Sequence, residues 1–146
     1  MIEILRAQRR IAPFVRRTPS ISSAWLAGLA GADVWLKPET LQLSNSFKAR
    51  GAFNAVIARL ERTPGATLRI VTASAGNHGR GLAAAARTFR LPLVVFTPAD
   101  APTSKLDVIR RDGADLRPDG RDYDEAERMA KAFASRTGAE FISPYN

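Results

Sequence analysis

The sequence predicts an α/β fold with an open parallel sheet of about four strands flanked by helices. Two patterns predict it. In residues 67–146, four short apolar runs alternate with three stretches of helical periodicity, and these stretches begin and end with residues that favour helix termini. A strand, helix, strand order repeated three times implies right-handed crossovers, and therefore parallel strands.

The first 66 residues predict three helices and one strand. Apolar residues at helical spacing predict a helix that ends before Pro13 and a second, short helix over 23–29. Residues 32–37 have the composition of a strand. A third helix is expected over 47–60, with Ser46 in the position of an N-cap.

The remaining residues predict the sheet and its connections. The strand candidates are residues 68–72, 93–97, 114–116 and 140–142. The first connecting helix follows residues 74–77, the second runs from near Pro102 to Gly113, and the third opens with Asp122-x-x-Glu125 and ends at Gly138. Proline at the start, glycine at the end and a start like a capping box are typical of helix termini.

The composition limits the chemistry that the chain can carry. Its 146 residues are 45% hydrophobic and 25% charged, which is enough to bury one core. There is no cysteine and one histidine, His78, so the sequence offers no disulfide, no cysteine nucleophile and no cluster of cysteines or histidines for a metal. We expect no metal site.

The formal charge of +8 makes a nucleic acid a partner to consider. The arginines are scattered, and no basic helix stripe, RNA-binding signature or zinc-finger spacing accompanies them. We therefore expect a charged surface and no nucleic-acid partner.

The N-terminal residues 1–10 carry Glu3 and three arginines without a continuous apolar run. This pattern is typical neither of a signal peptide nor of a membrane span. We expect no membrane partner and a cytoplasmic location.

The loop after the first strand of the sheet is a candidate ligand site. Residues 72–81 combine small residues with the free N–H groups of a helix start, where an anion such as a carboxylate or phosphate is favoured. In an open parallel sheet, ligands bind beyond the carboxyl ends of the strands. The spacing does not match dinucleotide or Walker phosphate loops, and tight packing is the alternative explanation of the small residues.

Lys48 is the second candidate, because it lies in a Ser-Phe-Lys run where a loop passes into a helix. A lysine in an apolar setting can attack a carbonyl carbon. From its position alone, an ordinary surface lysine is the alternative. His78 alone is equally explained by helix capping or packing.

Two longer motifs carry a resemblance to a known family. Residues 37–42 and 45–52 (KPETLQ and NSFKARGA) resemble the K-x-E-x-x-Q and S-F-K-x-R-G-A segment of fold-type II pyridoxal-phosphate enzymes. Residues 74–78 (SAGNH) resemble the substrate loop of that family, and residues 17–19 (RTP) its early T-P element. The matches follow one another in order along nearly the whole chain.

The resemblance implies roles for individual residues. Lys48 would hold pyridoxal 5'-phosphate covalently and then remove the substrate α-proton. Phe47 would pack on the cofactor ring, and Asn77 would bind the ring hydroxyl. The substrate carboxylate would be held by backbone N–H groups, supplied by Ser74, Ala75, Gly76, Asn77 and His78.

Within that family the motifs are most similar to those of serine/threonine dehydratases, which convert a β-hydroxy amino acid to a 2-keto acid and ammonia. Serine racemases resemble S-S-G-N-H at the substrate loop, whereas this sequence has Ala75. The alternatives are another fold-type II lyase, synthase or racemase, or a non-catalytic α/β binding module.

The resemblance also implies a division into domains. Residues 67–146 would form a small α/β domain, and residues 1–66, which carry Lys48, would form the N-terminal portion of an incomplete large domain. We therefore expect a fragment that is inactive alone, from an enzyme that is a homo-oligomer acting on a small amino acid.

Overall fold

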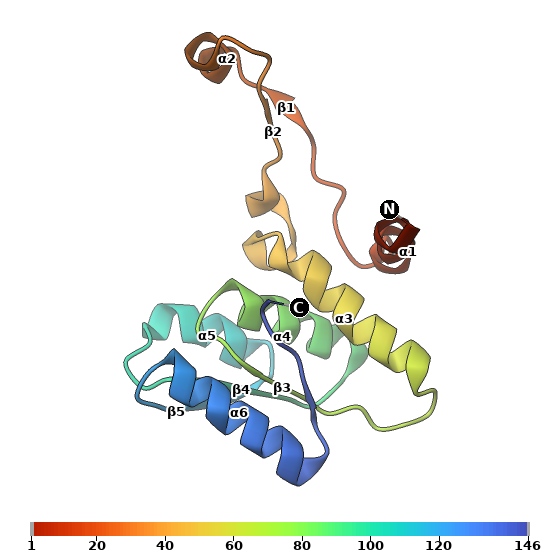
Figure 1. Cartoon of the computed structure of the whole chain (residues 1–146), viewed down its shortest axis with the longest axis vertical. Coiled ribbons are helices and arrows are strands. Elements are labelled where there is room, and N and C mark those ends of the chain that lie inside the picture. The colour runs from red at the N-terminus through yellow and green to blue at the C-terminus, as the bar shows by residue number, and fades with distance from the viewer. Residues whose placement is uncertain (1, 146) are drawn as a thin grey trace.

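The computed structural model describes residues 2–145 (Figure 1). The elements of the N-terminal part are α1 (Ile2–Ile11), β1 (Ile21–Ser22), α2 (Ala24–Ala30), β2 (Trp35–Leu36), the 3₁₀ helices η1 (Glu39–Leu41) and η2 (Leu43–Asn45), and α3 (Lys48–Arg62). Those that follow are β3 (Ile70–Ala73), α4 (Asn77–Phe89), β4 (Leu93–Pro98), α5 (Thr103–Arg111), β5 (Asp115–Gly120), α6 (Tyr123–Thr137) and β6 (Glu140–Phe141).

Strands β3 to β6 form the expected open sheet. Their order is β5-β4-β3-β6, and every neighbouring pair is parallel. The α/β fold with a four-stranded parallel sheet flanked by helices is therefore confirmed. The edge strand β5 is longer than predicted because it pairs with β4 along the polar run Asp115–Gly120. Backbone pairing at an edge needs no apolar pattern.

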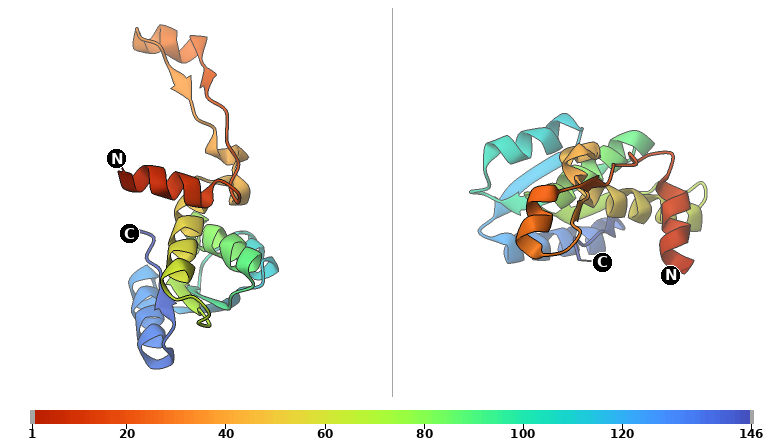
Figure 2. Two further views of the ribbon diagram at one scale, coloured as in Figure 1. Left: turned by 90° about the vertical axis from the view of Figure 1, so that its right-hand side faces the viewer. Right: turned by 90° about the horizontal axis from the view of Figure 1, so that it is seen from above.

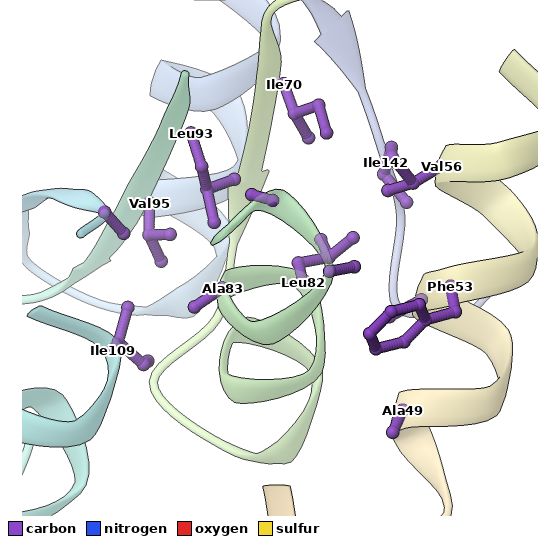
Figure 3. Close-up of a cluster of buried hydrophobic side chains, with 14 of the residues drawn as sticks. Ala49, Phe53, Val56, Ile70, Leu82, Ala83, Leu93, Val95, Ile109 and Ile142 are labelled. Carbon is purple, nitrogen blue, oxygen red and sulfur yellow. The ribbon is translucent and has the colours of Figure 1, made fainter. Parts of the chain in front are cut away.

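Helices cover both faces of this sheet (Figure 1). Side chains alternate along β3, so Ile70 faces the helices α3, α4 and α5 whereas Val71 faces α6. The larger of the two cores contains Phe53 of α3, Leu82 of α4 and Ile109 of α5 (Figure 3). Helix α3 thus shares one core with the sheet, across the predicted domain boundary at residue 66, and that boundary stays a prediction.

Strands β1 and β2 and helix α2 project away from the sheet (Figure 2). The strand predicted over 32–37 is reduced to β2, which pairs antiparallel with β1, a strand that no sequence pattern predicted. Helix α2 is bounded as expected, with Ser23 as its N-cap and Gly31, in the left-handed conformation, as its C-cap. Large apolar side chains of this part remain exposed, among them Trp25 and Trp35.

No helix in the described range is long and apolar enough to cross a membrane. Across residues 2–145 there is also no group of three or more His, Cys, Asp or Glu side chains placed to hold a metal ion.

Candidate active site

A pocket of about 150 Å³ brings Lys48 and His78 together. It lies at the C-terminal ends of β3 and β6, next to the segments that follow these strands. Its lining comes from the N-cap and first half of α3, the start of α4 and the segment after β6. It consists of Phe47, Lys48, Gly51, Ala52, Ala55, His78, Ile142, Ser143 and Pro144. The pocket is therefore at the carboxyl edge of the parallel sheet, where this class of fold binds its ligands.

Lys48 is half-buried at this pocket, in the first turn of α3. Its backbone N–H donates to the Ser46 hydroxyl at 3.2 Å, although the N-cap position itself belongs to Phe47. Its amine donates to the Pro144 carbonyl oxygen at 2.8 Å. None of the ion pairs formed within residues 2–145 includes this amine, so a neutral carbonyl is its hydrogen-bond partner.

Phe47 stands at the entrance of the same pocket. Its side chain is exposed, and the Lys48 amine lies 5.5 Å from the centre of its ring. An exposed aromatic face next to an amine offers a surface on which a planar ring can stack.

His78 is buried in the wall of the pocket. Its Nε2 atom lies 3.2 Å from the Ile142 carbonyl oxygen, and because that oxygen can only accept, Nε2 carries the proton. Burial lowers the pKa of His78 below its ordinary value, and the neighbouring charge of Lys48 acts in the same direction, against the hydrogen bond to Ile142. The ring is accordingly neutral at pH 7 and serves as a hydrogen-bond donor.

The loop before α4 is held by its own serine. The Ser74 hydroxyl accepts hydrogen bonds from the N–H groups of Gly76 at 3.2 Å and Gly79 at 3.0 Å. Gly79 has no room for a side chain, since a Cβ atom there would lie 2.9 Å from the Ser74 carbonyl oxygen. The Ser74 hydroxyl and the close packing at Gly79 therefore hold the backbone of this turn in place.

The predicted carboxylate-binding groups are not equivalent in this loop. The Ser74 N–H donates to the Phe96 carbonyl and the Gly76 N–H to the Ser74 hydroxyl. Within the described part of the chain, the N–H groups of Ala75, Asn77 and His78 have no acceptor. These three remain free to bind an anion at the start of α4.

The structure thus brings some of the predicted residues together and leaves others outside. Phe47, Lys48 and His78 line the pocket, whereas residues 74–77 lie on the adjoining loop and do not. The wall formed by residues 142–144 has no counterpart in the sequence motifs. The signal that could have found it is the rule that ligands gather after strand ends, applied to β6 as well as β3.

Other residues of the motifs hold the backbone in place. The Glu39 carboxylate accepts from Arg50 at 2.8 and 2.7 Å and from the Thr18 hydroxyl at 2.6 Å. Arg50 holds the pKa of Glu39 below its usual value. The fully buried Gln42 side chain bonds to the backbone N–H and carbonyl of Arg16. These contacts connect the segment before α3 to the first turn of that helix, and so help to position Lys48, the first residue of α3.

The donor set of the site suits a ligand with a reactive carbonyl, a flat ring and an anionic group. The Lys48 amine can attack the carbonyl carbon, the Phe47 face can receive the ring, and free N–H groups at a helix start can bind the anion. At about 150 Å³ the pocket is smaller than most ligand sites, which measure roughly 300–1,000 Å³. It therefore accounts for the surroundings of the amine, not for a whole ligand.

Known proteins are similar to this chain in sequence and in fold. The chain is 39% identical to the L-threonine ammonia-lyase of Thermotoga maritima over 99% of its own length and 35% of the relative. It is 34% identical to the serine racemase of Oryza sativa subsp. indica, over 98% of its length and 42% of the relative. The solved structure of maize serine racemase matches with a TM-score of 0.89 at 33% identity, over 99% of this chain and 44% of the other.

The chain therefore spans less than half of the length of these relatives. Residues 11–146 match the family described as "Pyridoxal-phosphate dependent enzyme". This match extends over nearly the whole chain. It confirms the resemblance that the motifs at residues 37–52 and 74–78 indicate. The chain belongs to the family of pyridoxal-phosphate dependent enzymes.

Proposed function

We propose that the enzyme carrying this chain is an ammonia-lyase of the threonine/serine dehydratase type, which converts a small β-hydroxy amino acid to a 2-keto acid and ammonia. The observation that carries the proposal is the Lys48 amine in a pocket beside a neutral, buried His78. The similarity to an L-threonine ammonia-lyase supports the reaction type.

Each group of the site has a part in this function. Lys48 would hold pyridoxal phosphate through its Nζ atom, Phe47 would cover the ring, and Asn77 would bind the ring hydroxyl. The bound cofactor supplies an electron sink for the negative charge that develops at the substrate α-carbon. The N–H groups of Ala75, Asn77 and His78 would orient the substrate carboxylate, and the Lys48 amine would take the α-proton.

Racemisation is the second candidate, because serine racemases are also among the relatives. A racemase needs a second group that can donate or accept a proton on the opposite face of the substrate. The methyl group of Ala75 can do neither. The alanine at position 75 therefore favours elimination over racemisation.

Selective labelling tests the first step. The protein is incubated with pyridoxal phosphate, reduced with borohydride and digested, and the four lysines (Lys37, Lys48, Lys105 and Lys131) are compared by mass spectrometry. Lys48 should carry most of the label, and Lys48→Ala should remove it while Lys105→Ala does not. Equal labelling of Lys48 and Lys105 would support a non-catalytic binding module instead.

Product analysis tests the reaction type. The enzyme carrying this chain should release keto acid from L-threonine or L-serine much faster than it forms the D-amino acid. Chiral chromatography of the remaining serine measures the second rate. D-serine formation as fast as keto-acid release would favour the racemase.

A further inference from the structure

The Ile142 carbonyl, just after β6, is held by two side chains. It accepts from the Thr72 hydroxyl at 2.7 Å and from Nε2 of His78 at 3.2 Å. All three residues are buried, and the Ile142 N–H donates to the Val71 carbonyl at 3.0 Å. Both backbone groups of Ile142 are therefore fixed to β3 and α4.

The Ile142 carbonyl is close in sequence to the group that binds the Lys48 amine. Two residues further on, the Pro144 carbonyl accepts the hydrogen bond of the Lys48 amine at 2.8 Å. The proline ring fixes φ at residue 144. Few rotatable bonds thus separate the clamped carbonyl from the one that holds the amine.

We propose that Thr72 and His78 are positioning residues, which hold the Pro144 carbonyl against the Lys48 amine and so restrain that amine until it attacks a carbonyl carbon. This inference rests on the proposed function in one respect, the role of Lys48 as the reactive amine. It adds two residues that act through the segment 142–144.

The hydrogen bond between the Lys48 amine and the Pro144 carbonyl should affect how fast this amine reacts. To attack an aldehyde, nitrogen must present its lone pair to the carbonyl carbon, form the N–C bond and release the aldehyde oxygen as water. The hydrogen bond to Pro144 restrains the orientation of the amine, and an aldehyde that enters the pocket is attacked only once the amine has turned toward it. Loosening the Ile142 clamp should therefore make Lys48 react faster with a small aldehyde that needs no binding site.

Reductive methylation measures this reactivity. The whole chain is treated with formaldehyde and cyanoborohydride, and the rate at each lysine is followed by mass spectrometry. Lys37 is the internal control, because its amine donates to the Thr18 carbonyl at 2.6 Å, in a different part of the molecule. General loosening of the fold would speed both lysines, whereas release of the clamp would speed only Lys48.

Matched variants separate the hydrogen bond from the shape of the side chain. Thr72→Val removes the hydroxyl at nearly constant volume, and Thr72→Ser keeps it. His78→Leu removes the ring donor, and His78→Gln keeps a donor. We expect Lys48 to react about three- to tenfold faster in Thr72→Val or His78→Leu, as the loss of one net hydrogen bond implies, with Lys37 unchanged and the conservative variants close to the parent.

Three results would overturn the proposal: an unchanged rate at Lys48 in folded Thr72→Val, a slower rate there, or an equal acceleration of Lys37. Should one variant fail to fold, the other still decides. The proposed function fails separately, when pyridoxal phosphate does not prefer Lys48 in the parent protein. That result leaves the formaldehyde measurement intact.

Discussion

A Cβ atom built on Gly81 of α4 would lie 3.2 Å from the carbonyl carbon and oxygen of Lys48, so the backbones of the two helices meet at this glycine. The neighbour is backbone, which cannot rotate aside as a side chain can. A glycine in the middle of a helix is otherwise unfavourable. Its presence at 81 is explained by the close approach that brings the first turn of α3 onto α4.

Gly81→Ala should therefore destabilise the protein in spite of the better helix propensity of alanine. Overpacking costs about 1–3 kcal/mol, and the propensity returns at most about 1 kcal/mol. The matched control is Gly51→Ala in α3, where a Cβ meets nothing within 4 Å and the free energy of unfolding should rise by up to about 1 kcal/mol. Urea unfolding of both variants measures the difference, and equal effects would contradict this account of the helix contact.

The ion pair between Glu39 and Arg50 should contribute measurably to stability, because it is bidentate and only partly exposed. We expect Glu39→Gln to lower the free energy of unfolding by about 1–2 kcal/mol. Glu3→Gln, which breaks an exposed pair with Arg6, should change it by less than about 0.5 kcal/mol. Similar losses in the two variants would show that the Glu39 network is no stronger than a surface pair.

The same carboxylate predicts how this difference depends on pH. The pKa of Glu39 is lowered in the folded protein, chiefly by the hydrogen bond from Arg50. Its contribution is present above the unfolded pKa and is lost as the pH falls through the folded one. The difference in the free energy of unfolding between the parent and Glu39→Gln should therefore shrink as the pH is lowered. Urea unfolding at several pH values would measure it.

Most of the sheet could be predicted because apolar runs and helix caps carry local signals. Three of the four strand candidates, those around Ile70, Leu93 and Glu140, differ from the structure by at most two residues at either end. The strand β1 could not be predicted, since its two residues pair with β2 without forming a core. Its one apolar side chain, Ile21, stays exposed, so burial imposes no pattern on the sequence there.

Some residues of the candidate site could likewise be predicted from the sequence, and others could not. Lys48 and the loop of residues 74–78 could be singled out from a motif and from strand-to-helix chemistry. Pro144 could not, because it meets Lys48 only through a contact that spans 96 residues of sequence. That contact depends on β6 lying beside β3 in the sheet, an order that the sequence does not state.

The free energy of unfolding should also depend on pH through the protonation of His78. Its pKa is lowered in the folded protein, mainly by burial, so below the ordinary value of about 6.5 the unfolded chain binds the proton more readily. The free energy of unfolding should therefore fall as the pH is lowered from about 7.5 to the folded pKa, and change no further through this group below it. Since His78 is the one histidine of the sequence, its ring resonances in NMR spectra give the midpoint without ambiguity.

His78→Gln provides the control for this pH dependence, because it keeps a hydrogen-bond donor and does not titrate. The slope of stability against pH between about 7.5 and 5 should be smaller in this variant than in the parent. A ring that titrates above its ordinary pKa would contradict both the burial argument and the neutral donor assigned to the Ile142 carbonyl.

The Ser74 hydroxyl should be a structural necessity of the loop, whatever ligand the loop binds. It satisfies the N–H groups of Gly76 and Gly79. A helix start leaves its first N–H groups without intrahelical partners. Gly79 is buried, so water cannot readily replace the lost acceptor there. Ser74→Ala should lower the free energy of unfolding by about 1–3 kcal/mol, which is the cost of an unsatisfied buried donor.

Thr88→Ala is the matched loss of a hydroxyl, since Thr88 donates to the Ala84 carbonyl on an exposed turn of the same helix, and its effect should stay within about 0.5 kcal/mol. Hydrogen exchange then separates a local from a global effect. In Ser74→Ala the Gly79 amide should exchange faster by a larger factor than the amide of Leu82, which lies in the body of α4, because a lost capping acceptor opens the helix start first. Equal acceleration of both amides would mean that Ser74 supports the whole helix, and the fixed turn that presents the N–H groups of Ala75, Asn77 and His78 would then depend on α4 rather than on its serine.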